Sequence, residues 1–188
     1  MKFRELGVDG CFEILLEPRS DERGWFSRAF CTREFQELGL DSHIAQVNSS
    51  FSQHAGTLRG MHFQSGASAE TKVVRSIRGA VYDVVIDLRR GSPTSGRWTS
   101  LELSEDLRNA IYIPKGCAHG VMTLVPNSEL LYAVSAPYDP SAEGGVRWDD
   151  PAFQVEWPSQ PLSISAKDQQ WAPWNGDWQE VSQGGSGT

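Results

Sequence analysis

The chain has 188 residues, of which 39% are hydrophobic and 22% charged, a balance that favours a single globular domain and excludes wholesale disorder. No stretch approaches the roughly 18 apolar residues that a membrane span needs, and the N-terminus lacks the apolar core of a secretory signal. We therefore expect a cytoplasmic protein that does not bind membranes. The formal net charge of −7 disfavours nucleic acid as a partner, although a local basic pocket could still bind a small anion.

Short apolar runs separated by turn residues predict an antiparallel β-sandwich or barrel. The runs that we interpret as strands cover residues 11–17, 44–50, 72–77, 80–88, 98–104, 110–114, 120–125 and 129–135. In the run 80–88 every even position is apolar, and this period of two predicts a strand with one buried face. Gly91 and Pro93 then break the chain before the next run.

Helices are expected only at the periphery. Residues 32–38 have a short helical pattern, with Thr32 as the N-cap and Gly39 as the C′ residue. The three cysteines, Cys11, Cys31 and Cys117, are odd in number, widely spaced and without a CxxC pair, so we expect reduced and mostly buried thiols.

The C-terminal part changes character after its last strand-like runs. Ser165 and Asp168 have the spacing of a helix cap, which predicts a small helical segment. Three tryptophans follow at helix-like intervals: Trp171, Trp174 and Trp178. We expect one domain over residues 1–178 and a flexible tail of linker composition over residues 179–188.

Two histidines lie in segments rich in polar residues and glycine. His119 ends the Pro-x-Gly-x-x-His pattern of residues 114–119, which resembles the second motif of the cupin barrels, where a metal often binds. The first cupin motif normally supplies His-x-His, but residues 62–64 read His-Phe-Gln, so an amide replaces one imidazole. With His62 and His119 as imidazoles, a metal would need a third ligand such as Glu70, and we expect a metal-free site.

Strict alternation along the strand around His62 places Arg59 on the opposite face of the sheet. Both side chains can serve one pocket only if the period is broken, or if Arg59 faces a site that a second chain completes. Gly60 lies between them, and a glycine within a strand often marks a β-bulge.

A series of motif blocks follows along the chain: DERGWF (21–26), QVN (46–48), LRGMHFQ (58–64), KVVR (72–75), RGAVYDV (78–84), DLRRGSPT (87–94), IPKGCAHG (113–120), LY (131–132), YDP (138–140) and RWDDP (147–151). In this order they resemble the motifs of the dTDP-4-dehydrorhamnose 3,5-epimerase family. The resemblance runs from about residue 10 to about residue 175. It implies an all-β double-stranded β-helix jelly roll of the cupin type with short peripheral helices. It also implies a homodimer that exchanges N-terminal strands, and no metal or other cofactor.

The resemblance further implies a nucleotide diphospho-4-keto-6-deoxyhexose as substrate, whose C4 ketone acidifies the hydrogens at C3 and C5. His62 would be the general base and Asp168 the carboxylate that orients it. Lys72 would stabilise the enolate, and Tyr132 would donate a proton on the opposite face of the sugar. The substrate-binding residues would be Arg23, Gln46, Asn48, Arg59, His119, Tyr138, Glu143 and Lys167.

Several differences from the family pattern leave the nucleobase open. Trp25 replaces a phenylalanine, Arg28 stands where a glutamate is usual, and residues 65–71 replace a proline-rich stretch. The motifs also fit epimerisation at C3 alone.

Two other functions remain as alternatives. One is a metal-dependent cupin oxygenase or isomerase built on His62, His119 and a carboxylate, which a stoichiometric metal would indicate. The other is a non-catalytic sugar-nucleotide binding module, which would bind its ligand without exchanging solvent hydrogen into the sugar.

Overall fold

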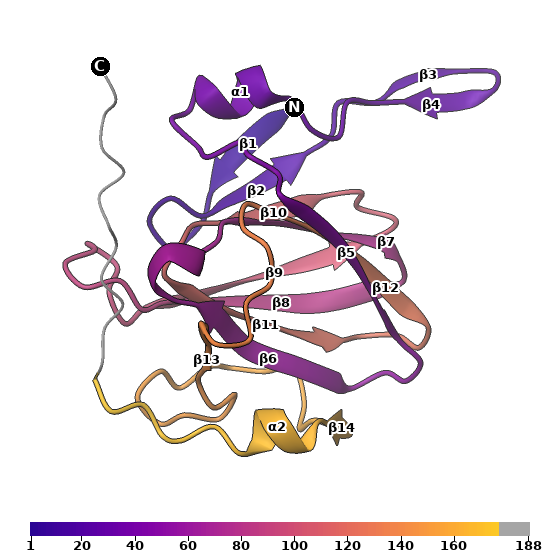
Figure 1. The fold of residues 1–188 in the computed structure, drawn as a ribbon. Coiled ribbons are helices and arrows are strands. Elements are labelled where there is room, and N and C mark those ends of the chain that lie inside the picture. Colours follow the sequence, from indigo (N-terminus) through magenta and orange to yellow (C-terminus); the bar gives the residue numbers. More distant parts are fainter. Residues whose placement is uncertain (177–188) are drawn as a thin grey trace, which may run out of the picture.

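A computed structural model describes residues 1–176, and its core is two β-sheets that face each other (Figure 1). The first sheet has the strand order β1 (Lys2–Glu5), β2 (Phe12–Leu15), β10 (Ala110–Ile113), β7 (Lys72–Arg78), β12 (Ser128–Val134) and β5 (Gln46–Ser52). The second has the order β13 (Glu143–Gly145), β6 (Thr57–Gln64), β11 (Cys117–Thr123), β8 (Ala80–Asp87) and β9 (Trp98–Ser104), and β14 (Ser163–Ile164) pairs with β6. From β5 to β13 the strands alternate between the two sheets as in a jelly roll, apart from the β8–β9 hairpin, and this confirms the expected cupin-type architecture.

The remaining elements lie outside these sheets. They are the hairpin β3 (Arg19–Asp21) and β4 (Gly24–Phe26), the helices α1 (Thr32–Gln36) and α2 (Ala166–Gln169), and a 3₁₀ turn over Gly66–Ser68. Among the described residues no helix is long and apolar enough to cross a membrane. The predicted tail, residues 179–188, lies outside the described residues.

Every predicted strand region contains a strand, but the expectation of one buried face for residues 80–88 is wrong. Val81 and Val85 belong to the core between the two sheets, where residues of both sheets meet. Val84 and Ile86 point the other way and are fully buried against Val146 and other residues of the C-terminal part. The C-terminal chain therefore covers the outer face of the second sheet, which a period-two pattern does not reveal.

The observed ends of the two helices differ from the predicted ones. Cys31, not Thr32, is the N-cap of α1, without a side-chain cap, and Glu37 is its C-cap, so Gly39 lies beyond the C′ position. Phe35 is the buried anchor of this helix on the first sheet. All three cysteines are free, and Cys11 and Cys117 are buried, as expected.

The predicted cap of the C-terminal helix is present, but the helix is shorter than the tryptophan spacing suggested. The Ser165 hydroxyl accepts a hydrogen bond from the Asp168 backbone N–H at 3.1 Å. The helix α2 ends at Gln169, so Trp171 and Trp174 follow it in irregular chain, and Trp178 lies outside the described residues. Because residue 173 is a proline, helical backbone is disfavoured just before it.

Candidate active site

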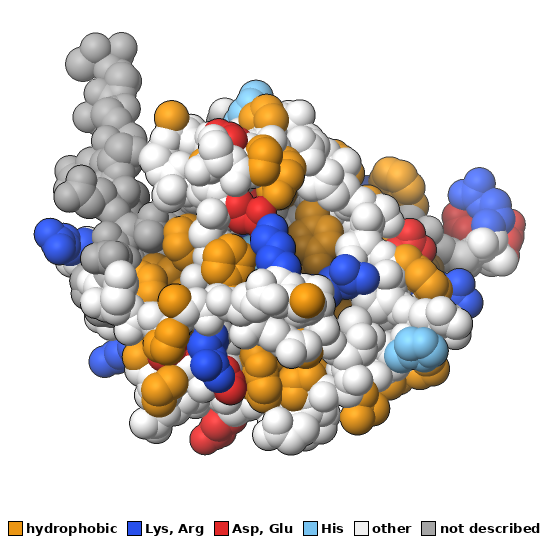
Figure 2. All heavy atoms as spheres, turned by 60° about the horizontal axis from the view of Figure 1, so that its bottom comes forward, with side chains coloured by type: hydrophobic (Ala, Val, Ile, Leu, Met, Phe, Trp, Pro, Cys, Tyr) orange, Lys and Arg blue, Asp and Glu red, His pale blue; other side chains and the backbone are white. Residues whose placement is uncertain are grey.

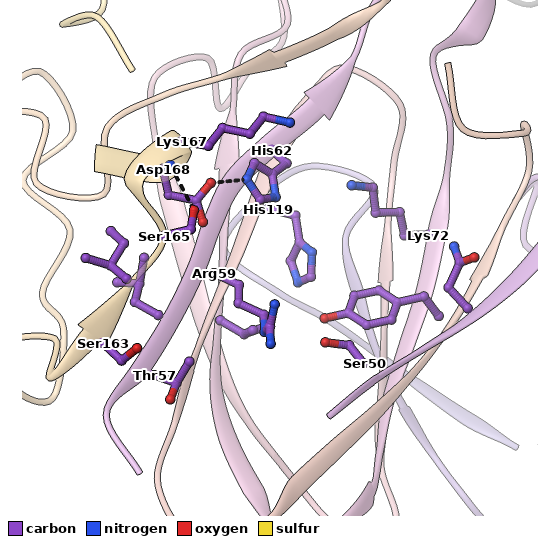
Figure 3. A pocket seen from close by; sticks show the side chains of 15 residues that line it. Ser50, Thr57, Arg59, His62, Lys72, His119, Ser163, Ser165, Lys167 and Asp168 are labelled. Atoms are coloured by element: carbon purple, nitrogen blue, oxygen red, sulfur yellow. Dashed lines mark hydrogen bonds and ion pairs between the residues drawn. The ribbon is translucent and has the colours of Figure 1, made fainter. Parts of the chain in front are cut away.

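A cavity of about 550 Å³ opens between the two sheets at the C-terminal segment. On the face turned forward in Figure 2, lysine and arginine side chains lie among hydrophobic ones near the middle. The cavity lining contains all four predicted catalytic residues and four of the predicted binding residues: His62, Asp168, Tyr132, Lys72, Asn48, Arg59, His119 and Lys167. Figure 3 shows Arg59, His62, Lys72 and His119 reaching this cavity from different strands, with Lys167 and Asp168 from α2.

His62 and Asp168 form a hydrogen-bonded pair on the wall made by β6 and α2. The distance from His62 Nε2 to Asp168 Oδ1 is 2.6 Å, and the Asp168 side chain is only 5% exposed (Figure 3). The backbone N–H of Gly60 donates to Asp168 Oδ2 at 3.3 Å. Burial alone would raise the pKa of Asp168, but the hydrogen bond and charge of His62, the Gly60 N–H and a side-chain hydrogen bond with Ser165 outweigh it, so the net pKa is lowered. The side chain is therefore held as a carboxylate.

A bulge at Gly60 turns both Arg59 and His62 towards the cavity. His62 pairs with His119 and Arg59 with Val121, so β6 has one more residue than β11 over this interval. Gly60 has a φ of 140°, and a Cβ there would lie 2.5 Å from the Cα of Gly120. Of the two explanations considered for Arg59, the bulge is the one that the structure shows.

Tyr132 and Lys72 come from the first sheet, so they face His62 across the cavity. Burial, and then the negative charge of Asp83, raises the pKa of the Tyr132 phenol well above its usual value, which keeps it protonated. The Lys72 ammonium lies 3.3 Å from a carboxylate oxygen of Glu70, and both side chains are largely buried.

Asp83 is hydrogen-bonded to a residue of the cavity, although the sequence motifs did not single it out. Its Oδ2 lies 2.8 Å from His119 Nε2, and both side chains are almost completely buried. The His119 ring lies edge-on to the Tyr132 ring, with the centroids 6.0 Å apart. The signal was the aspartate at an odd position of the apolar run 80–88, because a carboxylate inside a sheet needs a partner.

Three predicted binding residues lie at the rim of the cavity and do not line it: Gln46, Tyr138 and Glu143. The Tyr138 hydroxyl donates to Glu143 Oε2 at 2.6 Å, and Lys167 Nζ lies 2.6 Å from the same oxygen. The Gln46 amide donates to Asn48 Oδ1 at 2.7 Å and accepts from the Tyr138 backbone N–H at 3.2 Å. This network joins the rim to Asn48 and Lys167, which do line the cavity.

Arg23 does not belong to this cavity. It lies at the turn of the β3–β4 hairpin, which projects away from the body of the molecule (Figure 1). Its side chain is 83% exposed and pairs with Asp21 of the same hairpin. Arg23 therefore does not line the cavity of its own chain.

The cavity also contains small polar residues that sequence reasoning missed. They are Ser50, Thr57, Ser163 and Ser165. Ser50 had a usable signal, because it alternates with Asn48 along β5 and so shares its face. The residues of β14 had no such signal, because this strand is defined only by its pairing with the first two residues of β6 in the folded chain.

The residues that a metal centre would need are engaged elsewhere. The Gln64 amide donates to the carbonyls of Ser68 and Pro137 and accepts from the Asp139 N–H. Glu70 is paired with Lys72. Within residues 1–176 no three His, Cys, Asp or Glu side chains are grouped so that they could hold a metal ion.

A jelly roll with a histidine–carboxylate pair on one wall, and a tyrosine and a lysine on the other, defines an acid–base enzyme of the cupin superfamily. The model of the dTDP-4-dehydrorhamnose 3,5-epimerase family matches residues 5–176. The chain therefore belongs to the dTDP-4-dehydrorhamnose 3,5-epimerase family and is a carbohydrate epimerase, as the sequence motifs indicated.

Individual relatives agree with this assignment. The dTDP-4-dehydrorhamnose 3,5-epimerase of Sinorhizobium fredii is 43% identical over 157 residues, which cover 82% of this chain and 80% of the relative. A dTDP-4-dehydrorhamnose 3-epimerase of Streptomyces niveus is 39% identical, with coverages of 90% and 82%. The crystal structure of the 3,5-epimerase from Elizabethkingia anophelis superposes with a TM-score of 0.90 at 34% identity, covering 93% of this chain and 96% of that one.

Proposed function

We propose that this epimerase inverts C3, or both C3 and C5, of a dTDP-linked 4-keto-6-deoxyhexose. Deprotonation next to the C4 ketone gives an enolate, and return of a proton to the other face of the ring inverts the carbon. The names of the relatives support the dTDP-linked substrate, and they include both a 3,5-epimerase and a 3-epimerase. The regiochemistry is therefore left to the experiment below.

His62 is the base in this proposal. The imidazole is the side chain best suited to accepting and releasing a proton at neutral pH. The buried Asp168 carboxylate accepts a hydrogen bond from Nε2 of His62, which leaves Nδ1 as the basic nitrogen of the neutral ring. The same carboxylate stabilises the imidazolium that forms when the proton is taken.

The observation that carries the proposal is the placement of acid and base on opposing sheets. His62 belongs to β6 of the second sheet and Tyr132 to β12 of the first, and both line the cavity. A sugar bound between them would lose a proton to one side and receive one from the other, which is what inversion requires. Lys72, beside Tyr132, would stabilise the enolate oxygen by its charge.

Arg59 and Lys167 are the cationic groups that we assign to the diphosphate. Arg59 is pre-oriented, because Nε donates to the Ser52 hydroxyl and one terminal nitrogen donates to the Phe51 carbonyl, each at 3.1 Å. A guanidinium fork fixed in this way is well suited to phosphate oxygens. Two local cations can therefore bind a dianion although the whole chain is acidic, because distant charges are screened within about 8 Å.

We also propose a homodimer, supported by the outer face of the first sheet. Four apolar side chains are exposed there on neighbouring strands: Val47, Phe51, Ile77 and Leu131. Arg75, which is paired with Leu131 in the sheet, has a buried guanidinium nitrogen without a hydrogen-bond partner in residues 1–176. A second chain on this face would cover the apolar side chains and could supply the missing acceptor.

Incubation in D₂O with dTDP-, UDP-, GDP- and CDP-linked 4-keto-6-deoxyhexoses tests the proposed function. We expect deuterium at C3, or at C3 and C5, with the dTDP sugar, and the positions labelled give the regiochemistry. The His62→Ala variant is the control and should lose exchange by about 10² to 10⁴-fold while still binding dTDP. Binding of the sugar nucleotide without exchange in the wild-type protein would instead support the binding-module alternative, and a stoichiometric metal would support the metal-dependent one.

A further inference from the structure

A tryptophan from the C-terminal segment lies beside the His62 ring. The ring centroids of His62 and Trp171 are 6.4 Å apart, and the planes meet at 67°, an edge-to-face contact. Trp171 follows the end of α2 by two residues, so the short segment that supplies Asp168 also supplies this indole. His62 therefore has Asp168 at one ring nitrogen and Trp171 against the ring.

The Trp171 indole packs on Gly145, the residue that is paired with His62 in the neighbouring strand. Gly145 of β13 pairs directly with His62 of β6, and side chains at paired positions of antiparallel strands point to the same face. A Cβ at Gly145 would lie 2.1 Å from Cε2 of Trp171. The indole thus occupies the space in which residue 145 would carry a side chain. The φ of Gly145 is outside the left-handed region, so packing against the indole, and not backbone conformation, requires glycine here.

Packing on Gly145 and a cation–π contact, and not a hydrogen bond, hold the indole in this position. The Trp171 Nε1 atom is buried and has no hydrogen-bond partner within the part of the chain that the structure describes. The ammonium of Lys167 lies 5.9 Å from the ring centroid, within the range of a cation–π contact. Lys167 also pairs with Glu143, two residues before Gly145, so an ion pair joins α2 to the strand on which the indole packs.

We propose that Trp171, seated on Gly145, is a positioning residue for His62. The indole prevents the imidazole from rotating away from Asp168 and keeps water from that side of the ring. With the indole in place, the His62 side chain is 33% exposed. This inference rests on the proposed function, in which His62 takes the proton. Because small misplacements of a catalytic group have large effects on rate, the indole contributes more to turnover than to substrate binding.

Kinetics of two substitutions at Trp171 test this role. In Trp171→Ala we expect kcat for epimerisation to fall about 10 to 100-fold while KM changes less than about 3-fold. Trp171→Phe should recover most of the rate, because a second aromatic ring can sit edge-on to the imidazole. Trp157→Phe is the matched control, since Trp157 packs against Tyr82 in the outer cluster of the second sheet, and its kcat should stay within about 2-fold of wild type.

A double-mutant cycle with Gly145 separates positioning from general destabilisation. Gly145→Ala alone should lower kcat, because the new methyl group displaces the indole. In the Trp171→Ala background that space is vacant, so the same change should cost no further activity. Additive losses in the double variant, or an unchanged kcat in Trp171→Ala, would overturn the role.

A spectroscopic measurement keeps this test independent of turnover. In protein labelled with ¹⁵N-histidine, the His62 signals should shift or broaden in Trp171→Ala and in Asp168→Asn but not in Trp157→Phe. Unchanged His62 signals in Trp171→Ala would contradict positioning even if the enzyme is active. If the wild-type protein exchanges no deuterium into any sugar nucleotide, the proposed function fails, and the ¹⁵N comparison still decides whether Trp171 orients the ring.

Discussion

Asp168 is ionised in a place where only 5% of its side chain is exposed, and the residues around it compensate the loss of hydration. His62 and the Gly60 N–H each bind one of its carboxylate oxygens. The Ser165 cap fixes the turn of α2 from which the side chain projects. Orientation of the base and stability of the C-terminal segment therefore depend on the same carboxylate.

This dependence predicts how the stability responds to acid. The pKa of Asp168 in the unfolded chain is about 3.9, and the folded value is lower. Its contribution to the free energy of unfolding is therefore fully present above about pH 4 and is lost as the pH falls through the folded pKa. Urea unfolding of wild type and Asp168→Asn should show a difference near neutral pH that shrinks towards about pH 3. A difference that does not change with pH would contradict the assignment of an ionised Asp168.

Tyr132 allows the two proton transfers to be separated. In Tyr132→Phe the acid is missing, so the enolate is reprotonated from the side on which His62 removed the proton. We expect inversion to slow about 10² to 10⁴-fold while deuterium still enters the deprotonated carbon. NMR of the sugar after incubation in D₂O measures label and configuration together. The control is Tyr82→Phe, which removes a phenol hydroxyl that donates to Ser100 outside the cavity, and it should change neither exchange nor inversion. Equal losses of exchange and inversion in Tyr132→Phe would refute the assignment of Tyr132 as the acid.

At the scale of residues, the motifs predicted the residues that line the cavity better than the residues that contact them from behind. Tyr132, Lys72 and His119 lie in recognisable blocks, and the fold brings them together. Asp83 and Trp171 were not assigned to the site, because they contact its residues His119 and His62 from outside the recognised motif positions. Partners of this kind are fixed by contacts between distant segments, which spacing along the chain does not encode.

At the scale of elements, alternation identified the strands but not what covers them. The run 80–88 was recognised as a strand from its period, yet its second face is buried by chain that follows β13. The helix ends were less predictable, because α1 and α2 are too short for propensity to decide their limits. The bulge at Gly60 could be anticipated only because Arg59 and His62 needed the same face.

The bulge gives a prediction about stability. In Gly60→Ala a Cβ would lie 2.5 Å from the Gly120 Cα at a φ of 140°, so either β6 or β11 must move. We expect a loss of about 3 kcal/mol or more in the free energy of unfolding, the upper end for single substitutions. Gly91→Ala is the control, because its φ is also positive but nothing lies within 4 Å, and it should cost about 1 to 2 kcal/mol. Chemical denaturation measures both, and similar losses in the two variants would mean that the close approach to Gly120 is unimportant.

At the scale of the whole molecule, the proposed dimer accounts for the position of Arg23. Its hairpin leaves the body of the chain, with Arg23 and Phe26 exposed and without a described contact to the cavity (Figure 1). An arm of this kind is typical of segments exchanged between protomers. In the proposed dimer, Arg23 would bind the substrate of the partner and not that of its own chain. This would reconcile the binding role predicted for Arg23 with its distance from the cavity.

Heterodimers with one defect in each chain test this exchange. A chain with Arg23→Ala retains His62, and a partner with His62→Ala can supply its own Arg23 to that pocket. Coexpression with two different tags, followed by purification of the mixed dimer, should therefore restore activity to about half of wild type, because one of two pockets is intact. The control pairs His62→Ala with Arg59→Ala, whose arginine lines the cavity of its own chain, so neither pocket is complete and activity should stay low. No recovery with Arg23→Ala, or a monomer in sedimentation analysis, would show that the hairpin does not serve a neighbouring site.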